Sequence, residues 1–496
     1  TFNRKLIELQ KRFNHELWTH INPYTELAYK DDPVIVLSEI TNENDLWSQN
    51  ATLEPYRSEL ENLYRDWAKI NNIKVGKEKV AFDKKEINIQ KFFIEVTTNY
   101  YKEMIAHMRS IGVKIPIAGT NWTRNAAHLT AQVVCDFTDS HAYFYNFGLW
   151  GDGSRRFMNN SMTGSKGNMI PSLAYYRVQD KPFFISEWDN VWPNEWRAES
   201  SVLLASVIAF QGWGGATIHT YRYSQDEDVD MIGKPITANT LAGIYYRGGA
   251  FDTFNDPAKF GLFYHAALIA RRGDVKPANR TVSVKPADLF SGQGKAMALT
   301  AEKHRVETVP EGQVPKGDIV INTNESIFED NRNEVLSDTE ELYRNLDKKI
   351  GWVDTPKTKA VYGFVGKEGE IKLKDMSIEA KTDFATIAVS SLTDNPISSS
   401  ENMLLTAVGK AENTGSKFKF NDDGTAQQLE VGKGPVLIEI IEAVVKIKTD
   451  KSNLRVMSVN PQGSITGYMP SEYKDGVFSF EIGKEFQSMY YLIQSL

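Results

Sequence analysis

The stretch Lys181–Trp196, KPFFISEWDNVWPNEW, joins the pattern of a buried strand to an acidic residue at its end. Its apolar run Pro182–Ser186 predicts a short, fully buried β-strand. Glu187 follows directly, at the position where enzymes built on parallel strands carry their catalytic groups. Glu187 is therefore the first candidate for a catalytic side chain.

A second glutamate stands in an equivalent place upstream. The apolar run from Pro33 to Ile40 predicts another strand, and it leads into Thr41-Asn42-Glu43-Asn44. Because the carboxyl ends of parallel strands meet at one edge of a sheet, Glu43 and Glu187 are a candidate carboxylate pair. Taken alone, each is also compatible with an ordinary surface glutamate.

Three motifs occur in a fixed order along the chain: Asn42-Glu43, then His141-Ala142-Tyr143, then Glu187. Over about residues 1–280 the sequence resembles the retaining glycoside hydrolases of clan A, and most of all the cellulase-like enzymes of glycoside hydrolase family 5. In that clan Asn-Glu ends strand 4 of a (β/α)8 TIM barrel, His-x-Tyr follows strand 6, and a Glu ends strand 7. The resemblance implies that Glu43 is the acid/base and Glu187 the nucleophile of a double displacement at a β-glycosidic bond.

The same resemblance implies substrate-binding roles for residues around the pair. Asn42 is expected to hydrogen-bond the sugar 2-hydroxyl, Tyr143 to hydrogen-bond the nucleophile, and His141 to line the pocket. Aromatic residues that follow strand ends are candidates for stacking on pyranose rings; they are Trp47, Trp122, Trp188, Trp192 and Tyr221. Tyr221 stands where the family often has Trp. Plainer interpretations stay open: Asn42 as a turn cap, His141 as a structural histidine, and at least one of the Trp residues as core.

Counting strands by this resemblance leaves the barrel incomplete. If Glu43 ends strand 4, the chain supplies strands 4 to 8, whereas strands 1 to 3 would occupy roughly 100 residues upstream. Five strands cannot close a barrel, and their bare edges would be exposed. The sequence therefore predicts that a cleaved N-terminal fragment or a second chain supplies the missing strands.

The pattern changes at Gly273. Short alternating runs, such as Thr281–Val284 and Phe384–Val389, are separated by turn-forming residues from there on. Such runs predict an antiparallel β-sandwich. The expected domains are thus residues 1–272, the C-terminal portion of a catalytic (β/α)8 domain, and residues 273–496, an accessory β-sandwich.

Composition excludes several classes of function. The net charge of −7 and a pI near 5.8 argue against a nucleic-acid partner. No apolar run approaches the roughly 18 residues of a membrane span. The single cysteine, Cys135, allows no intrachain disulfide and lies in an apolar run, which predicts a buried small hydrophobe. No His-Glu-x-x-His pattern or cysteine cluster occurs, so we expect neither a metal nor a cofactor.

The sequence therefore favours a retaining β-glycosidase that acts on a β-linked oligo- or polysaccharide, outside the cell or at its surface. A different clan A enzyme, such as a β-galactosidase or a β-mannanase, is an alternative within the same class. From another class, a non-catalytic carbohydrate-binding protein with a remnant barrel is also compatible with the pattern. Pure binding would not need both Glu43 and Glu187, which favours the enzyme.

Overall fold

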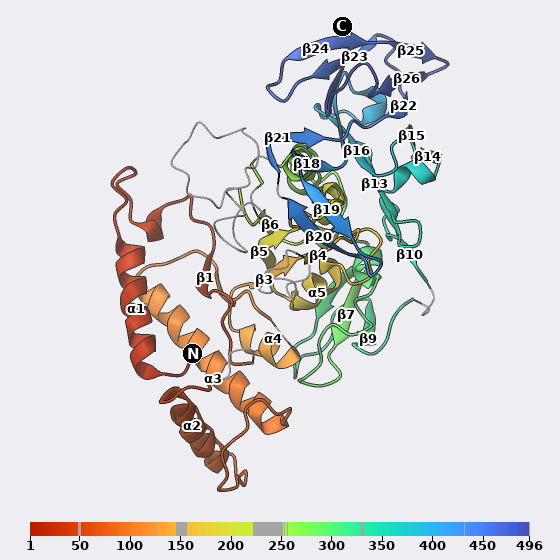
Figure 1. The fold of residues 1–496 in the computed structure, drawn as a ribbon. Coiled ribbons are helices and arrows are strands. Elements are labelled where there is room, and N and C mark those ends of the chain that lie inside the picture. The colour runs from red at the N-terminus through yellow and green to blue at the C-terminus, as the bar shows by residue number, and fades with distance from the viewer. Residues whose placement is uncertain are drawn as a thin grey trace.

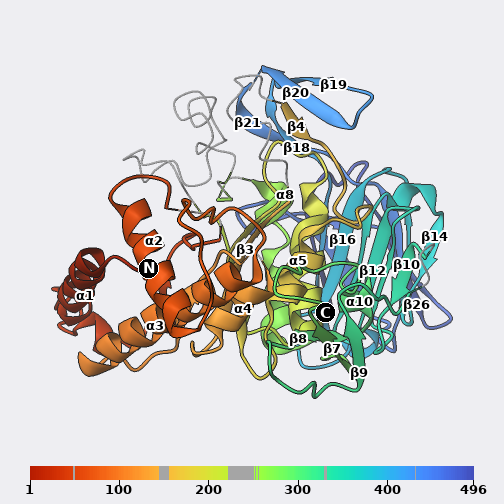
Figure 2. The same ribbon diagram turned by 90° about the horizontal axis from the view of Figure 1, so that it is seen from below.

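The computed structural model describes residues 1–47, 51–123, 125–144, 156–221, 251, 253–254, 256–328, 332–430 and 432–495. Helices and short parallel strands dominate the chain up to residue 322, and antiparallel strands dominate it afterwards. Figures 1 and 2 place the long helices α1 (Arg4–Thr19), α2 (Tyr56–Ile70) and α3 (Ile87–Ser110) on one side of the molecule and the antiparallel sheets on the other. Of the helices in these ranges, none is long and apolar enough to cross a bilayer.

The helices begin and end at residues with clear local reasons. Asn3 caps α1 and Asn125 caps α4 (Ala126–Gln132), each accepting a hydrogen bond from a backbone N–H of the first turn. Asn168 does the same for α5 (Met169–Tyr176). α6 (Ser200–Gln211) ends at Gly212 with φ 64°, a left-handed conformation that glycine adopts without strain. Nearly all of α6 is buried, so it forms the centre of the helical part rather than its surface.

Five parallel strands alternate with these helices. They are β1 (Ser38–Thr41), β2 (Ile117–Thr120), β3 (Thr138–Tyr143), β5 (Phe183–Asp189) and β6 (Gly215–Ile218). β1 pairs with β2, and β5 lies between β3 and β6. The backbone N–H of His141 donates to the carbonyl of Asn121 at 3.1 Å, which brings the end of β2 against β3. Strand-helix alternation of this kind produces parallel pairing because each helix returns the chain to the same edge.

Two strand boundaries differ from those expected. The strand predicted from Pro33 begins only at Ser38, and Val34 and Val36 are exposed rather than buried. The strand predicted to stop at Ser186 continues to Asp189, so Glu187 lies inside β5 instead of just beyond it. Apolar composition alone therefore misplaced the ends of both strands, although each strand exists.

A small parallel sheet follows the helical part. It contains β7 (Thr281–Lys285), β8 (Arg305–Thr308) and β9 (Ile319–Asn322), with β7 in the middle, and the short helix α10 (Thr300–Lys303) precedes β8. Val282, Val284 and Val306 share one core with α5 and α6. The prediction that Thr281–Val284 belongs to the antiparallel sandwich is therefore wrong. The run is buried on both faces, as strands of covered parallel sheets are.

Most of the remaining chain forms two antiparallel sheets. Within the described ranges, one sheet has nine strands in the order β10 (Glu334–Leu336), β11 (Leu342–Asn345), β12 (Ile350–Asp354), β13 (Thr358–Gly363), β16 (Ala385–Ser391), β17 (Asn402–Val408), β27 (Tyr490–Ser495), β23 (Leu454–Val459) and β24 (Ile465–Met469). The other has five, in the order β14 (Glu370–Lys372), β15 (Met376–Ala380), β22 (Ala443–Lys448), β26 (Val477–Ile482) and β25 (Ser471–Lys474). Ile387 and Leu405 of the first sheet share a core with Val445 and Phe478 of the second.

Shorter strands lead from these sheets back to the helical part. β18 (Ala411–Thr414) pairs with β21 (Lys433–Ile438), while β19 (Lys417–Phe420) and β20 (Thr425–Glu430) form a hairpin. β20 pairs in turn with β4 (Arg156–Met158), which precedes α5 in sequence. The short helices α8 (Pro257–Phe260) and α9 (Phe263–Ala267) lie at the junction, where His265 of α9 contacts Ser390 of β16 and Thr406 of β17 at 2.8 Å each. The two halves are therefore joined by backbone pairing as well as by side chains.

Buried arginines form ion pairs and hydrogen bonds at the junction between the helical part and the antiparallel sheets. Arg344 of β11 binds the carboxylate of Glu302 on α10 and donates to the carbonyls of Thr163 and Ser165 at 2.8 and 3.0 Å. Arg197, just before α6, pairs with Asp256 at 2.7 Å. Removing one partner from such a pair leaves an uncompensated charge in the interior.

The substitution Glu302→Ala is expected to lower the free energy of unfolding by about 3 to 5 kcal/mol, because it leaves the Arg344 guanidinium buried without its counter-charge. Urea unfolding followed by tryptophan fluorescence measures this loss. Asp394→Ala is the matched control, since it breaks a surface pair with Lys357 in which the Asp394 carboxylate is fully exposed, and it should cost no more than about 1 kcal/mol. Equal losses in the two variants would contradict the role given to the Arg344 pair.

Candidate active site

The two candidate glutamates meet around one histidine. Nδ1 of His141 lies 2.7 Å from Oε1 of Glu43 and 3.4 Å from Oε2 of Glu187. One ligand atom from each of the three residues lies within 4.8 Å of the others. The His141 side chain is almost fully buried, whereas those of Glu43 and Glu187 are 37% and 25% exposed. The two carboxylates therefore face each other at a surface that solvent reaches.

Two further rings border the Glu187 carboxylate. The Tyr143 hydroxyl donates a hydrogen bond to Oε2 of Glu187. Nδ1 of His219, which follows β6, lies 3.7 Å from the same oxygen, and its ring meets that of Tyr143 edge to face. Burial lowers the pKa of His219, while the negative charge of Glu187 acts in the opposite direction. His219 was not predicted as a site residue, because the family resemblance points to Tyr221 at that strand end.

A buried asparagine holds the turn that carries Glu43. Oδ1 of Asn121 accepts the backbone N–H of Glu43 at 2.9 Å. Its Nδ2 donates to Oδ1 of Asn42 at 2.9 Å and to Oε2 of Glu39 at 2.8 Å. The sequence placed Asn121 at a strand end, which was the only signal for it. Asn42 is thus tied to the scaffold next to Glu43.

β5 contains a bulge at the point from which Glu187 projects. Between the pairs Asp139–Phe184 and His141–Glu187 the chain advances two residues on β3 but three on β5, and β6 shows the same offset against β5. The extra residue is Ser186: its N–H donates to Oδ1 of Asp139 at 2.9 Å, and its carbonyl accepts from the Thr217 hydroxyl. Bulges re-aim the side chains beside them, so this one sets the direction of Glu187.

Carboxyl groups also lie beneath the pair. Burial raises the pKa of Asp139 to about 6, although N–H donors from Ser186 and Ser140 oppose the shift. Burial and then the nearby charge of Asp139 raise the pKa of Glu39 to about 9, with Glu187 adding to the effect and Asn121 opposing it. The raised pKa favours the protonated form of Glu39 at neutral pH, next to the partly exposed carboxylates of Glu43 and Glu187.

The predicted aromatic platforms have different outcomes. Trp192 is 1% exposed and donates through Nε1 to Glu412, and Trp188 is buried in the same core as α6. Neither ring presents a face to a ligand, which corrects the expectation for both. Trp47 stacks on His128 with ring centroids 4.5 Å apart and donates to Gln90, so it serves packing.

Two aromatic residues remain available at strand ends. Trp122 is half-buried and directly follows Asn121. Tyr221 is 49% exposed and packs against the rings of Phe254 and Phe260. The structure therefore leaves Trp122 and Tyr221 as the candidates for sugar stacking from the original set.

Glu43, His141 and Glu187 are also the group in the described chain that could hold a metal ion. Zinc ligands lie about 2.0 to 2.2 Å from the ion in a tetrahedral arrangement, which separates two ligand atoms by more than a hydrogen bond. The 2.7 Å between His141 and Glu43 fits a shared proton instead. As it stands, the arrangement suits proton transfer and nucleophilic attack better than metal binding.

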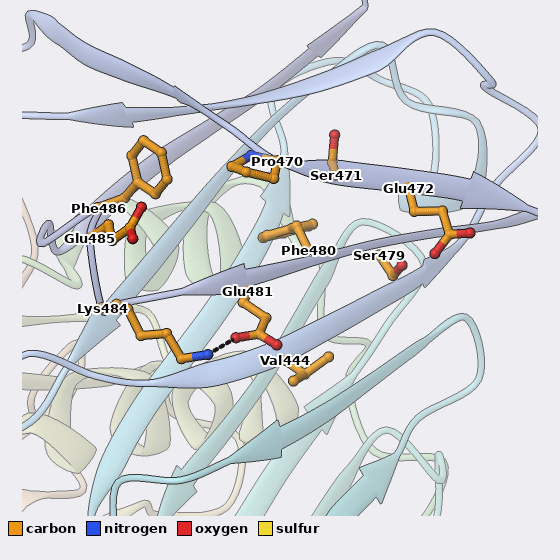
Figure 3. Close-up of a pocket in the computed structure, with 11 residues that line it drawn as sticks. Val444, Pro470, Ser471, Glu472, Ser479, Phe480, Glu481, Lys484, Glu485 and Phe486 are labelled. Atoms are coloured by element: carbon orange, nitrogen blue, oxygen red, sulfur yellow. Dashed lines mark hydrogen bonds and ion pairs between the residues drawn. The ribbon is translucent and has the colours of Figure 1, made fainter.

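A separate pocket lies on the five-stranded sheet, with a volume of about 510 Å³. Figure 3 shows Phe486, Pro470 and the acidic side chains around it, where Glu481 forms an ion pair with Lys484. Figures 1 and 2 place β26, which carries Glu481, well away from β3. The pocket therefore takes no part in the arrangement around Glu187.

No protein-family model matches this chain, and none of the curated proteins matches its sequence. Among solved structures, an endo-β-1,4-mannanase from Thermotoga petrophila is similar over 97% of this chain and 72% of that chain, with 12% identity and a TM-score of 0.34. An endo-1,4-β-mannanase from Rhizomucor miehei is similar over 44% of this chain and 53% of that chain, with 17% identity and a TM-score of 0.27.

A glycoside hydrolase family 5 mannosidase from Rhizomucor miehei is similar over 50% of this chain and 52% of that chain, with 12% identity and a TM-score of 0.28. This chain thus spans about half the length of the two Rhizomucor proteins. The similar structures are glycoside hydrolases, but with TM-scores this low, family and activity have to be argued from the site.

The substitution Glu39→Gln is expected to remove a pH-dependent loss of stability. Below the unfolded pKa of about 4.3 the Glu39 carboxyl is protonated in both the folded and the unfolded state, so it does not affect the free energy of unfolding. Between that pH and the folded pKa of about 9 only the unfolded state releases the proton, so the folded protein loses stability as the pH rises. The wild-type melting temperature should therefore fall relative to that of Glu39→Gln between pH 5 and pH 9. The groups facing Glu39, namely Asp139, Glu187 and Asn121, are unchanged in both proteins, so the difference between the two curves isolates Glu39. Parallel curves would contradict the assignment.

Proposed function

We propose that this protein is a retaining glycoside hydrolase that cleaves β-glycosidic bonds, with Glu187 as the nucleophile and Glu43 as the general acid/base. The supporting observation is the pair itself, with oxygens of both carboxylates and Nδ1 of His141 within 4.8 Å of one another. Retaining enzymes hold their carboxyl groups about 5 to 5.5 Å apart, and inverting enzymes about 6.5 to 9.5 Å. The close approach favours the retaining mechanism, because it leaves little room for a water between the two groups.

In the first step, a carboxylate oxygen of Glu187 attacks the anomeric carbon. The bond to the leaving oxygen breaks, and Glu43 gives its proton to that oxygen. In the second step, Glu43, now ionised, takes a proton from water, and the water oxygen attacks the anomeric carbon and releases Glu187. Two inversions leave the configuration of the anomeric carbon unchanged.

The neighbours of the pair suit these roles. Tyr143 donates to Oε2 of Glu187, so it orients the carboxylate whose other oxygen attacks the sugar. His141 touches both glutamates and can hold a proton between them as charge moves from one to the other. Like charges at short range separate the proton affinities of two carboxyl groups, so one stays ionised while the other is an acid.

The proposal extends to the fold. The strands β1, β2, β3, β5 and β6 would be strands 4 to 8 of a (β/α)8 barrel, with strands 1 to 3 supplied by a cleaved N-terminal fragment or a second chain. The antiparallel sheets would be an accessory β-sandwich. Parallel pairing, strand-helix alternation, and the positions of Glu43 just after β1 and Glu187 near the carboxyl end of β5 support this assignment.

The substrate is proposed as a β-linked oligo- or polysaccharide, with the sugar and the mode of attack to be found by assay. Aryl β-glucosides, β-mannosides and β-galactosides, together with the corresponding glycans, form the test panel. The protein should release the aryl group from at least one of them and give a product of retained configuration by NMR. Inverted configuration would overturn the retaining mechanism.

Glu187→Ala is expected to reduce kcat for such a substrate by several orders of magnitude, because it removes the carboxylate proposed to attack the anomeric carbon. Added azide should restore turnover and give the α-glycosyl azide, since azide enters from the side of the missing carboxylate. Glu43→Ala with azide should give the β-glycosyl azide, because azide then replaces the water of the second step. Glu481→Ala, in the pocket of Figure 3, is the control and should keep wild-type activity.

Absence of turnover in the full-length protein, combined with sugar binding that survives Glu187→Ala, would favour a non-catalytic carbohydrate-binding protein instead. Isothermal titration with the oligosaccharides of the same panel measures that binding. The two functions are distinguished because only the enzyme requires the Glu187 carboxylate to be intact.

A further inference from the structure

We propose that Asn121 is a positioning residue for Glu43: through its side-chain and backbone oxygens it fixes the turn and the histidine that aim the acid/base. This inference rests on the proposed function, because it assigns Asn121 a part in delivering the Glu43 proton. It adds a residue that follows β2 to the machinery of the site.

The side chain of Asn121 has no freedom in its orientation. The backbone N–H of Glu43 is a donor, so the atom 2.9 Å from it must be the amide oxygen of Asn121. The amide nitrogen then donates to Oδ1 of Asn42 and to Oε2 of Glu39, both of which can accept. Asn121 is 2% exposed, so water does not compete for these bonds. The amide group is thus fixed by three partners on the β1 segment.

Glu43 needs such a support because of its backbone conformation. Its φ is 45°, in the left-handed region that residues with a side chain rarely adopt. Left-handed conformation costs a non-glycine residue roughly 1 to 2 kcal/mol, so surrounding bonds must hold it. The bond from the Glu43 N–H to Asn121 acts at the strained residue itself.

The backbone of Asn121 completes a closed ring of contacts. Its carbonyl accepts the N–H of His141 at 3.1 Å, and Nδ1 of His141 contacts Oε1 of Glu43 at 2.7 Å. Asn121 therefore holds the main chain of Glu43 on one side and the main chain of His141 on the other. Loss of its side chain opens the ring only at Glu43.

Glu39 supports Asn121 from behind. Its Oε2 accepts from the amide nitrogen, and its Oε1 is buried with no hydrogen-bond partner in the described chain. A neutral carboxylic acid in this place accepts from Asn121 without adding a second negative charge next to Glu43.

Positioning of an acid has a kinetic signature that general structural damage lacks. Proton donation matters most for a leaving group that is a poor anion, and hardly at all for one that leaves readily as an anion. A small displacement of the acid is enough to slow proton transfer to the leaving oxygen. It therefore slows cleavage of unactivated substrates and has little effect on activated ones.

The test compares kcat/KM of the full-length protein for a 2,4-dinitrophenyl glycoside and for an unactivated oligosaccharide of the same sugar. Glu43→Ala sets the scale, with an expected loss of about 10² to 10⁴ on the oligosaccharide and little loss on the dinitrophenyl substrate. Asn121→Ala should lose about tenfold or more on the oligosaccharide and less than about threefold on the dinitrophenyl substrate. Asn121→Asp keeps an acceptor for the Glu43 N–H but loses the donor bonds to Asn42 and Glu39, so it should recover only part of that loss.

Gln132→Ala is the matched control, because Gln132 is a fully buried amide that donates to Thr123 and makes no contact with Glu43. It should lower the melting temperature without changing the ratio of the two rates. Equal losses on both substrates in Asn121→Ala would overturn the positioning role. If Asn121→Ala does not fold, Asn121→Leu takes its place, because leucine has a similar size and offers no acceptor to the Glu43 N–H. Equal losses on both substrates, or no loss on either, in Asn121→Leu overturn the proposal.

If Glu43→Ala loses as much kcat/KM on the dinitrophenyl substrate as on the oligosaccharide, Glu43 is not the acid. That result would reject both the proposed function and this inference. A selective loss in Glu43→Ala without one in Asn121→Ala would reject this inference alone. The two failures are therefore distinguishable in one set of assays.

Discussion

The register between β3 and β5 is the constraint on which the site depends. Parallel pairing sets His141 opposite Glu187, and Tyr143 two residues further along β3 reaches the same carboxylate. Glu43 follows β1, which is separated from β3 by β2. The turn after β1 therefore has to bring Glu43 to His141. A register slip of one residue would turn every side chain of β5 to the other face of the sheet. The site is therefore a property of strand pairing first and of individual residues second.

The rest of the fold keeps that pairing in place. α6 is buried almost completely between the parallel strands and the nine-stranded sheet, and its core includes residues from both halves of the chain. Buried Arg197 and Arg344 bridge the two halves with charged hydrogen bonds, Arg197 to Glu412 and Arg344 to Glu302. Such pairs add little net stability but penalise any arrangement that breaks them. The antiparallel sheets thus contribute to the shape of the candidate catalytic part as well as to their own core.

The sequence predicted the elements whose signals are local. Apolar runs located the parallel strands, and the motif order selected Glu43, Glu187, His141 and Tyr143, which the structure brings together; their chemical roles remain proposals. Features that depend on neighbours in space were missed. Asn121 had only its place at a predicted strand end to mark it, and Glu39 had no distinguishing mark, because their importance comes from contacts across strands. Trp192 looked like a platform because aromatic content cannot tell a core ring from an exposed one.

The bulge at Ser186 has a consequence for anyone who would move this site to another scaffold. Its backbone groups are bound by the side chains of Asp139 and Thr217, which belong to the flanking strands β3 and β6. A transplanted β5 would therefore straighten unless both neighbours travelled with it, and Glu187 would then point elsewhere. The smallest transferable unit is three strands wide, although the attacking group is a single side chain.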